Sequence, residues 1–222
     1  MPFSATEENY IKAIYALTHS LGVEHANTNQ LSSRLNNKAA SVSDMLQRLF
    51  EKKLIDYKKY HGVKLTKKGF SVAIQIVRKH RLWEVFLVEK LNFKWDEVHE
   101  IAEQLEHIQS EELVKRLDKF LHFPKHDPHG DPIPDIKGIV HELKQVELNT
   151  CKVKNKMIFS GVKLHTKEFL QHISNLGLKL REKIEIIHIT DFDGLIEVKI
   201  NSNKKTIHIG SKTASHILVE LL

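Results

Sequence analysis

Cysteine and long apolar runs are the two features that this sequence of 222 residues most clearly lacks. Cys151 is its single cysteine, so a disulfide within the chain is excluded and a reducing compartment is expected. No apolar run approaches the roughly 20 residues that a membrane-spanning helix needs. The opening stretch MPFSATEENY also lacks the charged and apolar regions of a signal peptide. We therefore expect a cytoplasmic protein without a membrane partner.

The charge balance is only mildly basic. Lysine and arginine number 34 against 28 aspartates and glutamates, which gives a net charge of +6. Such an excess permits a nucleic-acid partner but does not require one. Histidine is more informative, because the chain has 15 and imidazole is the commonest ligand of transition metals. Length and composition indicate a globular protein with room for two or three small domains.

The first segment, residues 1–76, has the element order of a winged helix-turn-helix. Ser4 and Glu7 form a capping-box pattern that begins a first helix. QLSSRLNNKAASVSDMLQRLFEKKLI then predicts a short helix, a turn and a longer helix. The buried stripe of the longer helix has helical spacing and consists of Val42, Met45, Leu46 and Leu49. Two short strands around His61-Gly62 follow, so the second helix is expected in the DNA major groove and the hairpin along the phosphates.

Candidate DNA contacts come from this second helix and from the hairpin. On the helix, the residues that precede the buried stripe or face away from it are Lys38, Ala40, Ser41, Ser43 and Asp44. The basic residues of the hairpin and its flank, suited to phosphate contacts, are Lys58, Lys59, Lys64, Lys67 and Lys68. The alternative is a small helical domain with a solvated lysine-rich loop. Because a run of lysines is usually just a solvated surface, the winged-helix prediction rests more on the order of elements than on the charge.

Three helices are predicted between residues 66 and 122. Thr66 can cap a long helix through KKGFSVAIQIVRKHRLWEVFLVEKL, and WDEVHEIAEQLEHI forms the second. Ser110 can cap the third helix, EELVKRLDKFL. These three helices form the second of three pieces into which the chain divides.

Histidine and glutamate gather on two of these helices. His80 and Glu84 are one turn apart on the first. On the second, a single helix face carries His99, Glu103, Glu106 and His107. Ion pairs on a wet surface are the alternative for any one of these pairs. Six such residues on neighbouring helices favour one or two divalent metal ions.

The last segment, from about residue 123, is rich in β structure. FPKHDPHGDPIPD has too many prolines for a helix or a central strand, so it predicts an ordered extended connection. A short helix, DIKGIVHELKQV, is expected next. KIEIIHI, GLIEVKI and KTIHIG read as strands, and HTKEFLQHISNLGL as a helix closed by Gly177. These elements predict a small SH3-like β-barrel, and the whole chain an α+β protein with domains at 1–76, 77–138 and 139–222.

Six segments, in this order, resemble the DtxR/MntR family of metal-dependent transcriptional repressors. They are TEENYIKAIYAL, LSSRLNNKAASVSDMLQRLFEKKLI, LTKKG, RKHRLWEVFL, EQLEHIQSEEL and DPHGDPIP. The resemblance covers the whole chain, including a C-terminal FeoA-type domain. It implies a homodimer with a winged helix and a helical dimerisation and metal domain. It also implies Fe2+ or Mn2+ as corepressor and palindromic operators of metal-uptake genes in double-stranded DNA.

The resemblance also implies the metal ligands. The family's primary site matches Glu103, Glu106 and His107, and its position on the first helix, Met or Asp in the family, is Asn9 here. A second family position on that helix, Glu in the manganese branch, is Lys12. The ancillary site matches His80, Glu84 and His99, with His165 and Glu168 as ligands from the C-terminal domain. A surface helix terminus is the alternative for the last two.

The expected metal is Mn2+, because residue 103 is Glu, as in the manganese branch of the family, whereas the iron branch has Cys at this position. Carboxylates and imidazoles suit Mn2+ and accept Fe2+, while Zn2+ or Co2+ would bind more tightly in vitro. An ion that joins the first helix to the dimerisation domain would fix the spacing of the two recognition helices. The family's base-reading Gln is Asp44 here, so the operator sequence does not carry over.

Two other classes of protein compete with a regulator. A metallohydrolase could use the Glu and His cluster, but residue 103 is Glu where the zinc-protease motifs require His. An accessory protein of iron transport could use the FeoA-like domain. That class leaves the winged helix without a role.

Overall fold

The computed structural model describes residues 3–20, 22–58, 61–140, 144–202 and 205–222. The chain forms two compact units. The first consists of Met1–His80, Glu103–Arg116 and Pro134–Ile139. The second consists of Arg81–Ala102, Leu117–Ile133 and Val140–Leu222. Two helices, α4 (Lys67–Leu91) and α6 (Glu111–Phe120), contribute residues to both units.

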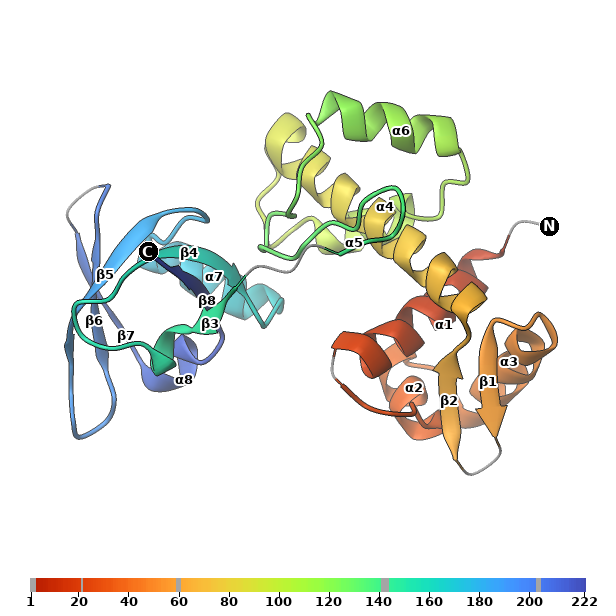
Figure 1. Cartoon of the computed structure of the whole chain (residues 1–222). Coiled ribbons are helices and arrows are strands. Elements are labelled where there is room, and N and C mark those ends of the chain that lie inside the picture. The colour runs from red at the N-terminus through yellow and green to blue at the C-terminus, as the bar shows by residue number, and fades with distance from the viewer. Residues whose placement is uncertain (1–2, 21, 59–60, 141–143, 203–204) are drawn as a thin grey trace. The chain divides into compact units, whose positions relative to one another are not determined.

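The first unit contains the predicted winged helix. In chain order its elements are α1 (Ala5–Tyr15), a π-helical turn η1 (Ala16–Ser20), α2 (Thr28–Leu35), α3 (Ala39–Glu51), β1 (Ile55–Lys58) and β2 (Gly62–Leu65). Figure 1 shows the β1–β2 hairpin beside α3. Its core is formed by side chains that are essentially inaccessible to solvent, among them Tyr10, Ile11, Ile14, Leu31, Val42, Leu46 and Leu49. The predicted stripe of α3 is confirmed, with Met45 partly buried beside it.

Local signals set the helix boundaries in this unit. The capping box is confirmed at the start of α1, where Ser4 accepts from the Glu7 backbone and Glu7 from the Ser4 backbone. Asn27 and Gln30 form a second capping box at α2. That helix ends at Asn36, whose left-handed φ of 50° turns the chain toward α3.

The wing is a short antiparallel hairpin. Tyr57 pairs with Val63 and Lys58 with Gly62, and Val63 also bridges to Ala26. Gly62 has a φ of +90°, and a Cβ there would lie 2.8 Å from the Ala26 carbonyl oxygen, so glycine is required.

Two of the proposed phosphate contacts lie partly beyond what the structure describes. Lys59 is outside the described residues, and of Lys58 only the backbone is described. Lys64 is solvent-exposed on β2, opposite Asp56.

The long helix and the third helix begin as predicted. The Thr66 hydroxyl accepts from the Gly69 backbone at 3.1 Å at the start of α4, and the Ser110 hydroxyl accepts from Leu113 before α6. The second helix is shorter than predicted, since α5 spans only His99–Leu105. A tight turn, in which the Ile108 amide donates to the Leu105 carbonyl, ends it early. No helix in the described part of the chain is long and apolar enough to cross a membrane.

The proline-rich connection is ordered, as predicted. Asp127 Oδ1 accepts from the backbone amides of His129 and Asp131, and Gly130 turns the chain with a φ of +92°. The helix predicted immediately after it is wrong for the described residues 135–140 and 144–145. Asp135 instead accepts from the amides of Lys137 and Ile139, which forms a turn at the point where that helix would begin.

The C-terminal part of the second unit is a small antiparallel sheet with one main helix. The strand order is β3-β8-β4-β5-β6-β7. The elements are β3 (Val146–Glu147), the 3-10 turn η2 (Leu148–Thr150), β4 (Lys156–Val162), α7 (Lys167–Leu176), β5 (Lys183–Ile189), β6 (Ile196–Ile200), β7 (Thr206–Ile209), α8 (Ser211–Ala214) and β8 (Ile217–Leu221).

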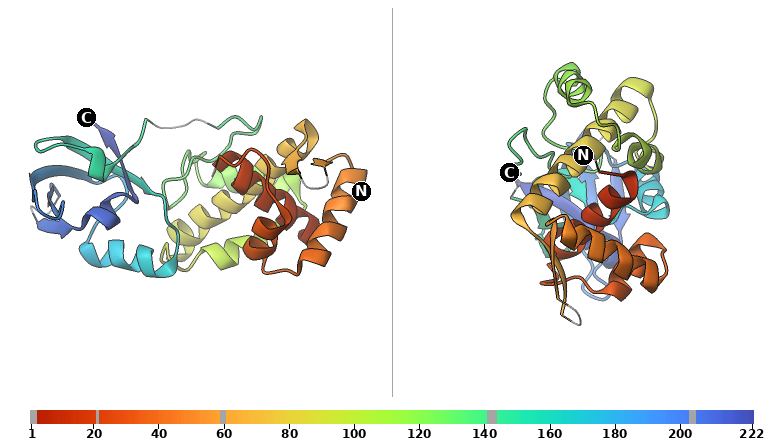
Figure 2. Two further views of the ribbon diagram at one scale, coloured as in Figure 1. Left: turned by 90° about the horizontal axis from the view of Figure 1, so that it is seen from below. Right: turned by 90° about the vertical axis from the view of Figure 1, so that its right-hand side faces the viewer.

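The helix α7 covers this sheet, as Figure 2 shows, and buries Leu170 and Ile173 in a core shared with the strands. Thr166 caps its start and Gly177, with a φ of +85°, its end. The three strands predicted here and the helix between β4 and β5 are confirmed. The result is the small SH3-like domain expected from the sequence.

Candidate metal centres

Glu106 is the centre of a polar cluster inside the first unit. Its side chain is fully buried, with 0% exposure. Oε2 lies 2.6 Å from His80 Nδ1 and 2.7 Å from Lys12 Nζ. Oε1 has no hydrogen-bond partner among the described residues and lies 4.0 Å from His107 Nε2. A buried carboxylate oxygen without a partner is costly, and a bound cation would satisfy it.

The surroundings of Glu106 favour its charged form. Burial alone would raise its pKa, but the hydrogen bond from His80 and the positive charge of Lys12 hold the pKa below the ordinary value. The carboxylate is therefore available to a cation at neutral pH.

Helix α1 brings two opposite charges to this cluster. Glu8 is buried, and its Oε2 lies 2.6 Å from His107 Nδ1, while Oε1 accepts from Gln109 at 3.0 Å. Because Nδ1 of His107 donates to Glu8, its Nε2 is left as the acceptor that faces Glu106. Lys12, one turn further along α1, points its ammonium at Glu106.

Asn9, the ligand expected from α1, lies on a different face. Its side chain is exposed, and among the described residues none forms a hydrogen bond with it. Its role as a ligand stays a prediction. Sequence reasoning missed Glu8, although its position one turn before Lys12 on α1 places both on one helix face.

Glu103 completes the donor set. It is 51% exposed, and its Oε1 lies 3.5 Å from Lys12 Nζ. Two carboxylates and the His80 imidazole thus lie within 3.5 Å of the Lys12 ammonium in the first unit, and His107 faces Glu106. Carboxylate and imidazole donors fit a divalent ion such as Mn2+ or Fe2+, and the unpartnered Oε1 gives such an ion a place to bind.

A second cluster lies in the second unit and joins Glu84, Asp127 and His129. One ligand atom from each lies within 4.8 Å of the others, and all three residues are buried. Nε2 of His129 lies 2.8 Å from the Trp95 carbonyl, to which it donates. Nδ1 then faces the carboxylates, 3.6 Å from Glu84 Oε2 and 4.0 Å from Asp127 Oδ1. Orientation of a ligating imidazole by a backbone carbonyl is typical of metal sites.

Without an ion, this second cluster retains protons. Burial and the charges of Asp131 and Glu84 raise the pKa of Asp127 to about 8. Burial works against the charged form of His129, but its hydrogen bond to Glu84 and the charges of Asp127 and Glu84 raise its pKa to about 9. A divalent cation could replace these protons.

The sequence predicted Glu84 but missed Asp127 and His129. The signal was present in DPHGDP, where an aspartate and a histidine two residues apart flank a proline in a tight turn. The neighbouring predicted ligand, His99, lies with Nδ1 3.4 Å from Glu84 Oε1. His80 is one turn before Glu84 on α4.

The two ligands predicted from the C-terminal domain differ in position. The His165 ring stacks on that of His129 at a centroid distance of 4.9 Å, and its Nε2 donates to the Val162 carbonyl at 3.2 Å. Glu168 is exposed in the first turn of α7. The structure thus brings His165 to the second cluster and leaves Glu168 facing solvent.

The residues proposed for DNA recognition are on the surface of α3. Val42, Leu46 and Leu49 are buried on the opposite side of the same helix. The exposed set consists of Lys38, Ala40, Ser41, Ser43 and Asp44. This helix therefore offers one polar face to a partner, as a recognition helix does.

Three family models match consecutive parts of the chain. Residues 2–63 match the N-terminal DNA-binding domain of iron dependent repressors, and residues 66–135 match their metal binding and dimerisation domain. Residues 146–221 match the FeoA domain. The iron-dependent repressor IdeR of Mycobacterium tuberculosis is 31% identical over 170 residues, which are 76% of this chain and 73% of that protein.

The chain belongs to the DtxR/MntR family of metal-dependent transcriptional repressors.

Solved structures of the family agree with this assignment. A manganese-dependent transcriptional repressor in complex with manganese is 32% identical, with a TM-score of 0.81 over 97% of this chain and 100% of that one. The manganese regulator SloR is also 32% identical, with a TM-score of 0.71 over 97% and 98% of the two chains. As a member of this family the chain is a metal-responsive DNA-binding regulator. That prediction is confirmed over the metallohydrolase alternative.

Proposed function

We propose that this member of the family is a cytoplasmic, Mn2+-responsive repressor that binds palindromic operators of metal-uptake genes as a homodimer. The observation that carries the proposal is the buried Glu106, whose unpartnered Oε1 faces His107 Nε2. Glu103 and His80 supply further donors around it. When bound, the ion supplies the positive charge that neutralises the two carboxylates.

The donor set supports manganese over iron. Carboxylate oxygens and imidazole nitrogens are hard to borderline ligands, and the cluster contains no thiolate among the described residues. Relatives of both kinds exist, since SloR is a manganese regulator and IdeR an iron-dependent repressor. Fe2+ is therefore the alternative corepressor, and Zn2+ or Co2+ would bind in vitro.

Helix α1 supports a coupling between metal and DNA. Tyr10, Ile11 and Ile14 of this helix are buried in the winged-helix core, while Glu8 and Lys12 reach the ligands of the primary site. A change of charge at Glu106 and His107 therefore acts on a helix that packs in the DNA-binding core. Ordering of α1 against these ligands would fix the presentation of α3.

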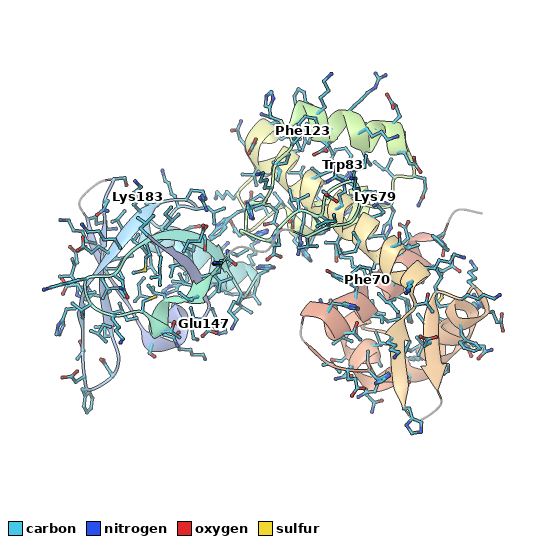
Figure 3. All side chains as sticks on the ribbon, in the orientation of Figure 1. Phe70, Lys79, Trp83, Phe123, Glu147 and Lys183 are labelled. Carbon is cyan, nitrogen blue, oxygen red and sulfur yellow. The ribbon has the colours of Figure 1, made fainter. Side chains whose placement is uncertain are left out.

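Exposed aromatic surface supports a homodimer. Phe120 and Phe123 are 56% and 63% exposed, and Leu91 is 52% exposed. Phe86 packs between Trp83 and Phe120. Figure 3 labels Trp83 and Phe123 on the helical part of the second unit. Large exposed apolar side chains of this kind indicate a protein interface, and a second copy of the chain is the partner that the dimerisation domain implies.

The second cluster supports an ancillary ion. Glu84, Asp127 and His129 would hold it, with His99 beside Glu84 and His165 beside His129. His80, by its place one turn before Glu84, and Glu168, on α7, remain proposed ligands of the same site.

Mobility-shift titrations test the proposed function. A promoter fragment of a metal-uptake gene should be retarded when Mn2+ is present and released when a chelator is added. Parallel titrations with Fe2+ under anaerobic conditions and with Zn2+ rank the metals. Equal retardation with and without a chelator would contradict a metal-responsive repressor.

A further inference from the structure

We propose that Lys12 is a tethered internal cation, which occupies the primary site in the metal-free protein and must leave before a divalent ion binds. The proposal rests on the proposed function of that site and adds a regulatory element to it. Lys12 would set the metal concentration at which the repressor responds.

The position of the ammonium carries the argument. Lys12 Nζ lies 2.7 Å from Glu106 Oε2, 3.3 Å from His80 Nδ1 and 3.5 Å from Glu103 Oε1. It therefore contacts three of the side chains expected to bind metal. A divalent ion bound by Glu106 and Glu103 would lie next to this ammonium, and two positive charges about 4 Å apart repel strongly where water is partly excluded.

The chemistry of lysine suits a cation that must leave the primary site when a divalent ion binds. Its ammonium is a compact charge on a flexible four-carbon stem, which can rotate away without moving the helix. The side chain keeps 20% of its surface accessible, so a path to solvent exists. Glu106 at the other end of the pair is 0% exposed and cannot follow.

Glu8, on the same helix as Lys12, has the opposite effect on metal binding. It hydrogen-bonds Nδ1 of His107, which leaves Nε2 free for a ligand. Glu8 is thus compatible with a bound ion, whereas Lys12 competes with it. Metal binding would displace the ammonium of Lys12 and keep the contact between Glu8 and His107, so Lys12 is the residue of α1 that reports occupancy of the site to the winged helix.

Removal of the Lys12 charge should therefore raise the Mn2+ affinity and lower the stability of the metal-free protein. In a Lys12→Met variant the metal no longer competes with an ammonium, so Mn2+ should bind about tenfold more tightly or better, which corresponds to about 1.4 kcal/mol. The metal-free protein should melt at a lower temperature, because Glu106 loses a charged partner in a buried position. A lysine that merely held Glu106 in place for the metal would give weaker Mn2+ binding on the same substitution.

Isothermal titration of the full chain with MnCl2 tests the proposal. A background of Glu84→Gln and His129→Gln removes two donors of the second cluster and confines the titration to the primary site. Lys12→Arg retains the charge and should stay within a few-fold of the wild-type affinity. Lys52→Met is the matched control, because Lys52 also pairs with a glutamate of α1, Glu7, outside the cluster. It should lower the melting temperature and leave Mn2+ affinity unchanged.

Equal or weaker Mn2+ binding by Lys12→Met would overturn the proposal, as would the same gain in Lys52→Met. If Lys12→Met does not fold, Lys12→Gln takes its place, with the same expected gain and the same contradicting result. Failure of the proposed function has a different signature. In that case the background protein, with Glu84→Gln and His129→Gln and with Lys12 intact, would bind no Mn2+ at all.

Discussion

His129 shows how one neighbour prepares a side chain for a role. The Trp95 carbonyl accepts a hydrogen bond from Nε2, so Nδ1 is directed toward Glu84 and Asp127. The residues DPHG do not predict this orientation of the His129 ring, because it depends on a carbonyl 34 positions away in the sequence. The tautomer follows from the fold, and with it the suitability of the imidazole as a ligand.

Replacement of His129 by Gln should remove one of two proposed ions. The amide can preserve the hydrogen bond to Trp95 but is a poor substitute for an imidazole ligand. Metal analysis after dialysis against Mn2+ should then give about one ion per chain in place of two. His172→Gln, an exposed histidine on α7, is the control and should retain both. Two ions in the His129 variant would exclude His129 as a ligand of the ancillary ion.

Helix α1 links local sequence signals to the primary site. Its capping box fixes the first turn, which in turn sets the faces on which Glu8 and Lys12 lie. Burial opposes ionisation of Glu7, but hydrogen bonds from Lys52 and Ser4 lower its pKa below the ordinary 4.5. A carboxylate with a lowered pKa in the folded state contributes stability above its unfolded pKa, and this contribution is lost as the pH falls through the folded value.

The variant Glu7→Gln tests this contribution. Gln retains the capping box, so the variant removes mainly the charge. At pH 7 it should be less stable by about 1 kcal/mol, the usual worth of a hydrogen bond. Thermal melts in a chelator should show this difference shrinking as the pH is lowered below 4.5. A difference that grows on acidification would contradict the assigned direction of the pKa.

The wing and the recognition helix should act through the phosphates and the bases respectively. The triple variant Lys58→Ala, Lys59→Ala and Lys64→Ala should weaken binding to all DNA sequences alike. The slope of log affinity against log salt should fall by up to about 3, near 0.9 for each lost phosphate contact. Alanine at three exposed lysines of the C-terminal domain, Lys152, Lys156 and Lys183, is the control. A wild-type slope in the wing variant would refute the phosphate contacts.

Elements with strong local signals were predictable from the sequence. The helix α4 follows a threonine cap, and α7 lies between a threonine cap and Gly177. The strands β5 to β7 alternate or run with β-branched residues. Local signals sufficed because each of these elements also buries one continuous apolar face.

Elements decided by side-chain hydrogen bonds or by distant partners were not predictable. The helix expected after residue 134 is replaced by a turn that the Asp135 carboxylate stabilises. α5 ends at Leu105, before Glu106 and His107. These two side chains bind His80, Lys12 and Glu8, which are far away in sequence. The sequence placed Lys12 at a position that is Glu in the manganese branch of the family, but it did not predict the contact of its ammonium with Glu106.

At the scale of the whole molecule, a palindromic operator requires two copies of the chain. Phe120→Asp places a charge in the exposed aromatic surface of the second unit and should shift the protein toward monomers in sedimentation velocity. Phe192→Asp is the matched control, because Phe192 is 98% exposed in the turn between β5 and β6 of the FeoA domain. Dissociation by the control alone, or by neither variant, would place the dimer interface elsewhere.

Glu106 is the residue through which we expect the metal to control DNA binding. Glu106→Gln removes one negative charge and nearly preserves shape. Loss of a charge-assisted contact is worth on the order of 1–3 kcal/mol. Glu111→Gln makes the same chemical change at an exposed site in the first turn of α6.

The most direct measurement is the Mn2+ concentration that gives half-maximal operator retardation in these two variants and the wild type. Glu106→Gln should need at least about tenfold more Mn2+ for half-maximal retardation. Its non-specific DNA binding in the presence of a chelator should be unchanged. Glu111→Gln should behave as the wild type. An unchanged Mn2+ requirement in Glu106→Gln would show that the cluster is an internal ion-pair network and that the metal-sensing site lies elsewhere.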